Sequence, residues 1–279
     1  MARLVGFIGN RPDLGARVID MEGRALDVRC KPGITPGWGV GFYQGGEILL
    51  KRRPLDDRSE LRLVDLTRDI RADALIAQVR LATVGALRTE NTHPFRYRQW
   101  LFANTGTVPG FDRLRDRLID QLPQFLQRAV HGETDSELLF HLFLSFLHDT
   151  GELDRPAVPA ASARAALRGA IALVDRLCAE EGAPETALNI LVTNPDYLLA
   201  VHAGPAMGYC VFQGQRDLER MFGGDGGLGR MRIPDYAGSR LTLIASDFED
   251  AELPPRWTSV PERAIVTVTR ADDPTIEKL

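Results

Sequence analysis

The order of strand-like and helical segments constrains this chain most. Short apolar runs typical of strands fill its first and last thirds, and longer segments with helical spacing fill the middle. A chain of alternating βαβ units would mix the two types along its whole length. Two blocks of strands on either side of a block of helices instead predict helices layered on antiparallel sheets.

The expected strands are runs rich in Val, Ile, Leu and Phe that are bounded by turn-forming residues. Gly45 and Gly46 separate two of them and predict a tight hairpin. The expected strands cover residues 4–8, 37–43, 47–52, 74–82, 99–106, 187–193, 197–203, 209–213, 240–246 and 264–270.

Three segments in the middle of the chain, 113–130, 136–150 and 163–182, carry apolar residues at helical spacing. Thr134 or Asp135 is a suitable N-cap for the second of these helices. Residues 154–162, with two prolines, are expected to form a surface connection. The glycine-rich segment 223–239 lacks the lysine-containing pattern of a P-loop, so we expect a flexible loop there.

Composition and charge exclude several classes of protein. The 279 residues, 44% hydrophobic and 26% charged, are those of a globular chain of one large domain or two small ones. The net charge of −4 gives no electrostatic attraction to nucleic acid or to an anionic membrane. No apolar run approaches the roughly 20 residues that cross a bilayer, and the N-terminus lacks the features of a signal peptide.

The cysteines predict neither a metal site nor a disulfide framework. Cys30, Cys178 and Cys210 are far apart and odd in number, and none is paired with another cysteine or a histidine at metal-ligand spacing. We therefore expect free thiols in a reducing, cytoplasmic environment, with no metal and no other cofactor.

Five short motifs occur in a recognisable order, although each alone is weak. They are ARLVGF at the N-terminus, GWGVGFY (37–43), VRLATVGALRTENTHPF (79–95), WLFANTGTVPGF (100–111) and GETDSELLF (132–140); LTLIASDFED (241–250) follows later. Together they resemble the class II glutamine amidotransferases, especially the stand-alone bacterial group that includes the ergothioneine-pathway amidohydrolase. The resemblance extends from residue 2 to about residue 270.

This resemblance implies an α+β fold, the four-layer αββα Ntn-hydrolase sandwich, formed by residues 2–279 as a single type-2 amidotransferase domain. In that family the initiator Met is removed, and the exposed cysteine becomes the nucleophile. Its own α-amino group acts as the base, because a thiol with a pKa of about 8.5 reacts slowly until a base assists it.

Two charged residues match the family's clamp for the α-amino-acid end of the substrate. Arg80 matches the arginine that pairs with the α-carboxylate, a task suited to a planar guanidinium, although an ordinary surface ion pair would also explain it. Asp135 matches the carboxylate that holds the α-ammonium group. It also suits a helix N-cap, and the two roles are compatible.

Several further positions match parts of the same pocket. Thr83, Asn91 and His93 match residues that shape it; His93 invites assignment as a general base, but in this motif we expect it to be structural. Gly106 matches the glycine whose backbone N–H forms half of the oxyanion hole. The remaining matches, Trp38 and Gly39, correspond to the wall near the nucleophile.

The sequence departs from the family pattern where the chemistry should occur. Ala2 occupies the position of the nucleophilic cysteine, and Thr105 occupies that of the asparagine which donates to the oxyanion. Losing one such donor typically costs about 2.7–4 kcal/mol of transition-state stabilisation. Asn104 could serve only if the strand slipped by one residue, which reverses side-chain direction. Gln78 and Pro36 also replace residues common in relatives, namely His and Asp.

Three interpretations follow. In the first, which the group of changes favours, the protein is a pseudoenzyme that binds glutamine or a γ-glutamyl compound without hydrolysing it. In the second, alanine at position 2 disables an otherwise active γ-glutamyl amidohydrolase. In the third, the pocket is vestigial in an interaction protein. Any acceptor of ammonia would be a separate protein, and the sequence is compatible with a homo-oligomer.

Overall fold

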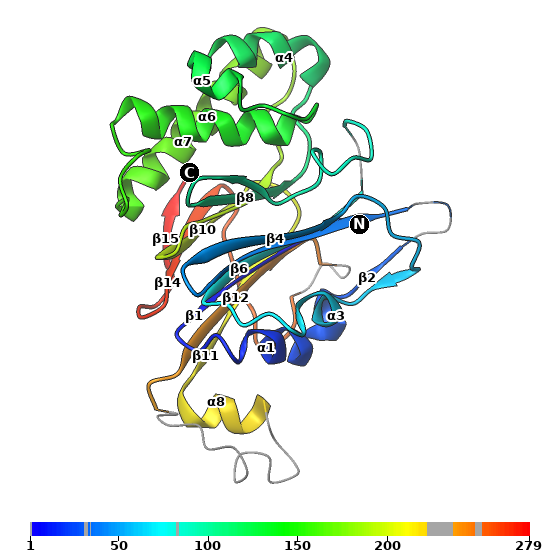
Figure 1. Cartoon of the computed structure of the whole chain (residues 1–279), viewed down its shortest axis with the longest axis vertical. Coiled ribbons are helices and arrows are strands. Elements are labelled where there is room, and N and C mark those ends of the chain that lie inside the picture. Colours follow the sequence, from blue (N-terminus) through cyan, green and yellow to red (C-terminus); the bar gives the residue numbers. More distant parts are fainter. Residues whose placement is uncertain (1, 31–32, 34, 82–83, 222–236, 249–252) are drawn as a thin grey trace.

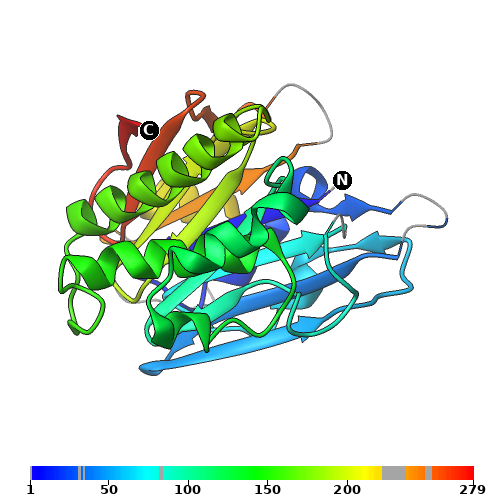
Figure 2. The ribbon, with the colours of Figure 1, turned by 90° about the horizontal axis from the view of Figure 1, so that it is seen from above.

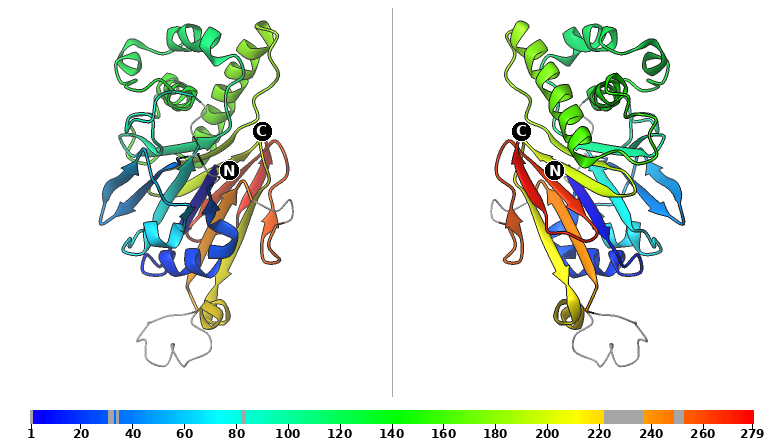
Figure 3. Two further views of the ribbon diagram at one scale, coloured as in Figure 1. Left: turned by 90° about the vertical axis from the view of Figure 1, so that its right-hand side faces the viewer. Right: turned by 90° about the vertical axis from the view of Figure 1, so that its left-hand side faces the viewer.

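The chain folds into four layers, with two β-sheets packed face to face between two groups of helices (Figure 1). The computed structural model describes residues 2–30, 33, 35–81, 84–221, 237–248 and 253–279. Both side views show one helical group above the sheets and the other beneath them (Figure 3). The expected αββα sandwich of antiparallel sheets is confirmed.

The first sheet joins strands from both ends of the chain. Over the described residues its order is β13-β11-β12-β1-β6-β3-β4, and every pairing is antiparallel. The strands are β1 (Arg3–Gly9), β3 (Gly37–Gln44), β4 (Glu47–Arg53), β6 (Ala74–Arg80), β11 (Met207–Gln213), β12 (Arg240–Ser246) and β13 (Thr258–Ser259).

The second sheet has the order β15-β14-β10-β9-β8-β7 over the described residues and is also antiparallel. Its strands are β7 (Phe95–Tyr97), β8 (Trp100–Thr105), β9 (Asn189–Thr193), β10 (Tyr197–His202), β14 (Ala264–Thr269) and β15 (Thr275–Lys278). A separate short pair joins β2 (Val28–Arg29) to β5 (Glu60–Leu61).

The helices fall into two groups. The outer face of the second sheet carries α4 (Phe111–Asp120), α5 (Gln124–Gln127), α6 (Asp135–Asp149) and α7 (Ala160–Glu180), and α7 is the longest (Figure 2). The outer face of the first sheet carries α1 (Gly15–Met21), α2 (Gly23–Leu26), α3 (Leu63–Thr67) and α8 (Gly214–Met221). No helix in the described part of the chain has the length and apolar character needed to cross a membrane.

Strand β1 explains why the N-terminal sequence is apolar throughout. Its two edges pair with β12 and β6, and each of its faces is buried against another layer. Leu4 and Ile8 pack between the two sheets, whereas Val5 and Phe7 pack toward the α1–α3 layer. The residue before this strand is thereby held at the end of a central strand of the sheet.

Two expectations about helices were wrong. The single helix expected over 113–130 is divided into α4 and α5, because Pro123 has no N–H to donate and its φ of −61° is paired with an extended ψ of 149°. The first third, expected to contain only strands and turns, also contains α1, α2 and α3. These helices have four to seven residues, too few to establish a helical period in the sequence.

The other expected elements are present within a few residues of their expected bounds. The hairpin between β3 and β4 turns at Gly45 and Gly46, whose φ angles are +61° and +82°. The N-cap of α6 is Thr134, whose hydroxyl accepts from the N–H of Glu137. A flexible loop was expected at 223–239. Its residues 223–236 lie outside the described part of the chain.

Candidate functional site

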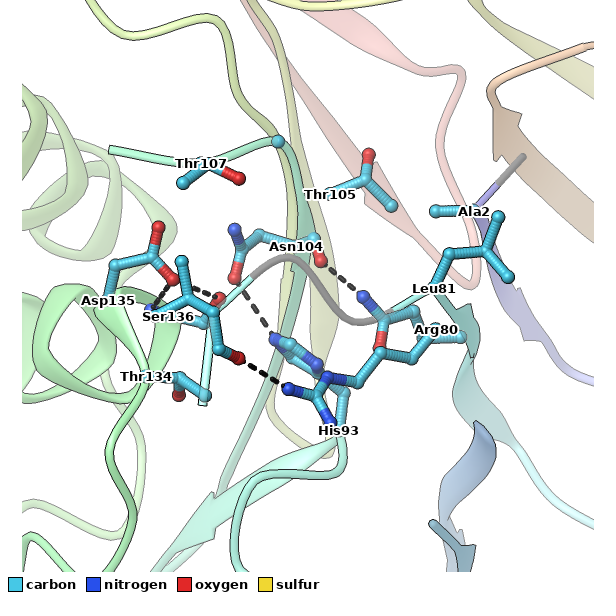
Figure 4. A pocket seen from close by; sticks show the side chains of 13 residues that line it. Ala2, Arg80, Leu81, His93, Asn104, Thr105, Thr107, Thr134, Asp135 and Ser136 are labelled. Atoms are coloured by element: carbon cyan, nitrogen blue, oxygen red, sulfur yellow. Dashed lines mark hydrogen bonds between the residues drawn. The ribbon is translucent and has the colours of Figure 1, made fainter. Parts of the chain in front are cut away.

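A cavity of about 260 Å³ lies where β1, β6 and β8 approach the first turn of α6 (Figure 4). Its lining combines residues from both sheets and from the helical layer. It is formed by Ala2, Gln78, Arg80, Leu81, Val84, His93, Asn104, Thr105, Gly106, Thr107, Thr134, Asp135 and Ser136.

Arg80 contributes a buried positive charge to this cavity. It ends β6 and is only 5% exposed, so it is not part of a surface ion pair. One guanidinium nitrogen, Nη2, donates to the carbonyl oxygen of Val84 at 2.6 Å, whereas Nη1 is buried without a hydrogen-bond partner among the described residues. Burial lowers the pKa of Arg80, and the nearby Asp135 raises it. An anion in the cavity would compensate for the lost hydration.

Asp135 contributes the opposing negative charge. It is the first residue of α6 and 4% exposed, and its carboxylate accepts from the backbone N–H groups of Val108 at 2.7 Å and Ser136 at 2.9 Å. Burial raises the pKa of Asp135, and these hydrogen bonds lower it. No direct ion pair between Arg80 and Asp135 is found among the described residues, so two opposite charges face one cavity separately.

Asn104 and Thr105, the last residues of β8, line the cavity from two sides. Neighbouring residues of a strand point in opposite directions. The amide oxygen of Asn104 lies 3.1 Å from Nε2 of His93 on the helical side, and its Nδ2 contacts no acceptor among the described residues. The Thr105 hydroxyl donates to Asp247 at 2.9 Å on the other side. Both residues therefore reach the cavity without any slip of the strand.

His93 is fully buried and holds Asn104 in place. Burial is the largest effect and lowers the pKa of His93 to about 3, a shift that its hydrogen bond to Asn104 opposes and the charges of Arg80 and Arg52 reinforce. The imidazole is therefore neutral at physiological pH. A group with so low a pKa does not suit a general base near neutral pH.

The depressed pKa of His93 makes the fold sensitive to acid. Since the unfolded histidine titrates near 6.5, the unfolded state binds more protons below that pH, and stability is lost as the pH falls toward 3. Between pH 7 and pH 4.5 this one group should cost about 2.5 kcal/mol of unfolding free energy. Urea unfolding of the protein and of His93→Gln at both pH values measures this loss of unfolding free energy. Equal losses in the two proteins would contradict the assignment.

Ala2 and Gly106 also line the cavity. Ala2 precedes β1 and presents only a methyl group. Gly106 has a φ of +101°, and a Cβ atom there would lie 2.2 Å from the carbonyl oxygen of Ala187, so only glycine fits. Gln78 also lines the cavity and donates from Nε2 to the carbonyl oxygen of Asn104.

Four of the residues expected at the site are not placed in the cavity lining. Asn91 instead bridges backbone groups, donating to the carbonyl of Ala86 and accepting from the N–H of Glu133. Trp38 donates from its indole to Asp56. A Cβ atom on Gly39 would lie 1.9 Å from the carbonyl oxygen of His93, so this glycine permits close packing behind the cavity. The fourth residue, Thr83, lies outside the described residues.

Pro36 also lies outside the cavity lining, and its carbonyl accepts from the N–H of Asp56. A change at this position therefore does not alter the cavity directly.

Asp247 was not identified from the sequence, although it supports the cavity wall. It follows β12, is 7% exposed and has a φ of +60°. Its carboxylate accepts from the hydroxyls of Thr105 and Ser246, and burial raises its pKa while Arg3 lowers it. A polar Ser-Asp pair directly after an apolar strand was the available signal. Within the described residues, no group of three His, Cys, Asp or Glu side chains could hold a metal ion.

Comparison with known families gives a match over most of the chain. The sequence profile described as "Glutamine amidotransferases class-II" matches residues 1–212. The probable glutamine amidotransferase DUG3 of Saccharomyces cerevisiae is 30% identical over 131 residues, 44% of this chain and 36% of that protein. The γ-glutamyl-hercynylcysteine sulfoxide hydrolase of Mycobacterium tuberculosis is 31% identical over 117 residues, 39% of this chain and 50% of that protein.

The matched regions thus span about a third to a half of the length of these curated relatives.

Solved structures are similar over nearly the whole chain. A class II glutamine aminotransferase domain protein from Silicibacter pomeroyi gives a TM-score of 0.61 at 19% identity, covering 99% of this chain and 98% of that one. A predicted glutamine amidotransferase from Pseudomonas aeruginosa gives 0.60 at 20% identity, covering 97% and 98%. At such identities this likeness concerns the fold.

Proposed function

Because the chain belongs to the class II glutamine amidotransferases, we propose that its cavity binds glutamine or a γ-glutamyl compound without hydrolysing it. One observation carries this proposal. Arg80 and Asp135, buried and opposite in charge, line the same cavity without pairing with each other, while position 2 offers no nucleophile.

The arrangement suits the α-amino-acid end of such a ligand. A carboxylate beside Arg80 would receive the guanidinium N–H groups, of which Nη1 has no other partner among the described residues. An ammonium group on the neighbouring carbon would lie near Asp135. A cavity of about 260 Å³ is slightly smaller than the roughly 300–1,000 Å³ of drug-sized ligand sites, which suits a ligand as small as an amino acid.

The groups that would face the ligand's side-chain amide can bind it but do not include a nucleophile. The methyl group of Ala2 cannot attack an amide carbon, and the Thr105 hydroxyl already donates to Asp247. Asn104 Nδ2 and the Gly106 backbone remain as polar groups for the ligand's side-chain amide. The family's thioester route therefore has no nucleophile at its usual position.

The convergence of Arg80 and Asp135 also favours binding over a vestigial pocket. Two desolvated charges that have no ion pair with each other are unfavourable unless a ligand compensates them.

We further propose that residues 2–279 form one amidotransferase domain. This is supported by β1 pairing with β12, which joins segments more than 230 residues apart in one sheet.

Calorimetry with L-glutamine and γ-glutamyl amides tests the proposed function. We expect saturable binding with a Kd below about 1 mM, equivalent to about −4 kcal/mol, and no release of glutamate or ammonia. The absence of heat with every one of these ligands at millimolar concentration would disprove ligand binding. D-Glutamine is the matched control, because the clamp fixes the positions of the carboxylate and ammonium groups.

The affinity should depend on pH through Asp135. An ammonium ligand prefers the ionised carboxylate, and burial raises the pKa of Asp135 above its ordinary value near 4. Affinity should thus fall on acidification, starting at a higher pH than for an exposed aspartate. Titrations of the protein and of Asp135→Asn at each pH measure this; a weak but pH-independent affinity is expected of the variant.

A further inference from the structure

A second and larger cavity, about 790 Å³, lies beside the first and takes no part in the proposed function. It is located where the outer strands of the two sheets, β4 and β7, approach α6. The first turn of α6 and the segment 93–95 separate the cavities: His93 and Asp135 line the first, whereas Phe95 and Glu137 line the second.

The floor of this second cavity is apolar and aromatic. Phe95, Phe140 and His141 are 5%, 1% and 4% exposed, and Tyr97 and Leu50 are half-buried beside them. The ring centroids of Tyr97 and His141 lie 6.4 Å apart, and those of Phe140 and His141 lie 5.8 Å apart, both in edge-on arrangements. Such a surface favours a flat apolar group of about the size of one ring.

The rim of the cavity carries two arginines that lack carboxylate partners. Arg52 donates to the carbonyl oxygen of Thr92 at 3.3 Å, and Arg96 donates to that of Ile48 at 3.1 Å. Neither forms an ion pair within 4.0 Å among the described residues. Burial lowers the pKa of Arg52, and the charges of Glu90 and Glu137 only partly offset this effect. The rim can therefore accept an anionic group.

Two acidic residues also line the cavity, but neither occupies the guanidinium groups of the two arginines. Glu137 is 4% exposed, and its carboxylate accepts from the backbone N–H groups of His131 at 2.9 Å and Gly132 at 2.6 Å. Both of its carboxylate oxygens thus accept from the loop before α6, although its charge still acts on Arg52. Glu90 is exposed on the rim, where solvent screens its charge, and neither carboxylate forms an ion pair with Arg52 or Arg96 among the described residues.

We propose that this second cavity binds a small carboxylic acid with an aromatic or alicyclic ring. The ring lies on the floor formed by Phe95, Phe140 and His141, and the carboxylate lies at the rim beside Arg52 and Arg96. A guanidinium binds a carboxylate in a planar, two-point contact, and here that contact would also replace hydration lost by Arg52. The site is distinct from the amino-acid clamp and does not depend on it.

Calorimetry with sodium benzoate and neutral benzamide, which have nearly the same shape, tests this proposal on the full chain. Benzoate should bind with a Kd of about 1 mM or tighter, and benzamide at least about tenfold more weakly. Arg52→Gln should weaken benzoate binding by about tenfold or more. The matched control, Arg71→Gln, removes an exposed arginine on the α1–α3 side and should leave the affinity unchanged.

A second variant keeps the test independent of Arg52. Ala129→Trp adds an indole to the wall of the cavity and should abolish benzoate binding, while circular dichroism shows a native fold and L-glutamine binding is unchanged. Three results would overturn the proposal: no binding of benzoate, equal affinities for benzoate and benzamide, or benzoate binding that depends on Arg80 and not on Arg52. The last result would place benzoate in the first cavity.

Discussion

Arg80→Gln should weaken the binding of L-glutamine by about 100-fold or more while leaving the fold intact. The variant loses the only cationic side chain of the described cavity lining, so the ligand's carboxylate would be buried without a counter-charge. Removing one partner of a buried, hydrogen-bonded charge pair typically costs about 2–5 kcal/mol, which corresponds to roughly 30-fold to several thousand-fold in affinity.

Calorimetry measures the loss, and two controls define its cause. Arg80→Lys retains the charge but not the planar fork, so its affinity should lie between those of the protein and Arg80→Gln. Arg96→Gln removes an arginine from the neighbouring cavity and should have no effect on glutamine. Arg80→Gln also loses the hydrogen bond to the Val84 carbonyl, so circular dichroism must show that the variant keeps the native fold. Glutamine affinity within a few-fold of the original would disprove the assigned role.

Ala2→Cys should convert the protein from one without detectable amide hydrolysis into a slow hydrolase of glutamine or a γ-glutamyl amide. Once the initiator Met is removed, the new thiol and its own α-amine would stand at the end of the cavity that Ala2 now lines. The rate should stay low because the Thr105 hydroxyl already donates to Asp247 and does not offer this hydrogen to the oxyanion. One missing oxyanion donor typically reduces kcat by about 10²–10³-fold.

Combining Ala2→Cys with Thr105→Asn therefore extends the test. The added amide could donate to the developing oxyanion, and we expect kcat to rise by about 10²-fold over Ala2→Cys alone. Thr105→Asn without the cysteine is the matched control and should be inactive. Intact mass must first show that Met1 is removed, and release of glutamate measures the reaction. If the double variant binds glutamine but releases no glutamate, differences at further positions must also prevent catalysis.

Local patterns predicted most of the sheets because each strand carries its own signal. The apolar run of β1 and the paired glycines between β3 and β4 are properties of adjacent residues. The break at Pro123 could also have been read from the sequence, since proline disfavours a continuous helix. Short helices such as α1 could not, because seven residues provide fewer than two full turns of periodicity.

The site was only partly predictable, because shared motifs contain supporting residues as well as contacting ones. Arg80 and Asp135 reach the cavity, whereas Asn91 fixes a loop and Gly39 permits close packing. No local pattern could relate Thr105 to Asp247, since their hydrogen bond spans 142 residues of sequence. That contact depends on how the ends of β8 and β12 meet, which only the tertiary structure determines.

The attachment of Ala2 to a central strand has an evolutionary consequence. Residue 2 lies at the end of β1, while the charged clamp belongs to β6 and α6, so these two parts of the cavity are encoded by separate segments. The Ala2 side chain belongs to none of the described hydrophobic clusters, and a one-residue exchange there leaves the packing of both sheets untouched. An exchange at this one position can thus remove the nucleophile from such a cavity at little cost in stability, while the charged clamp on the other segments stays unchanged.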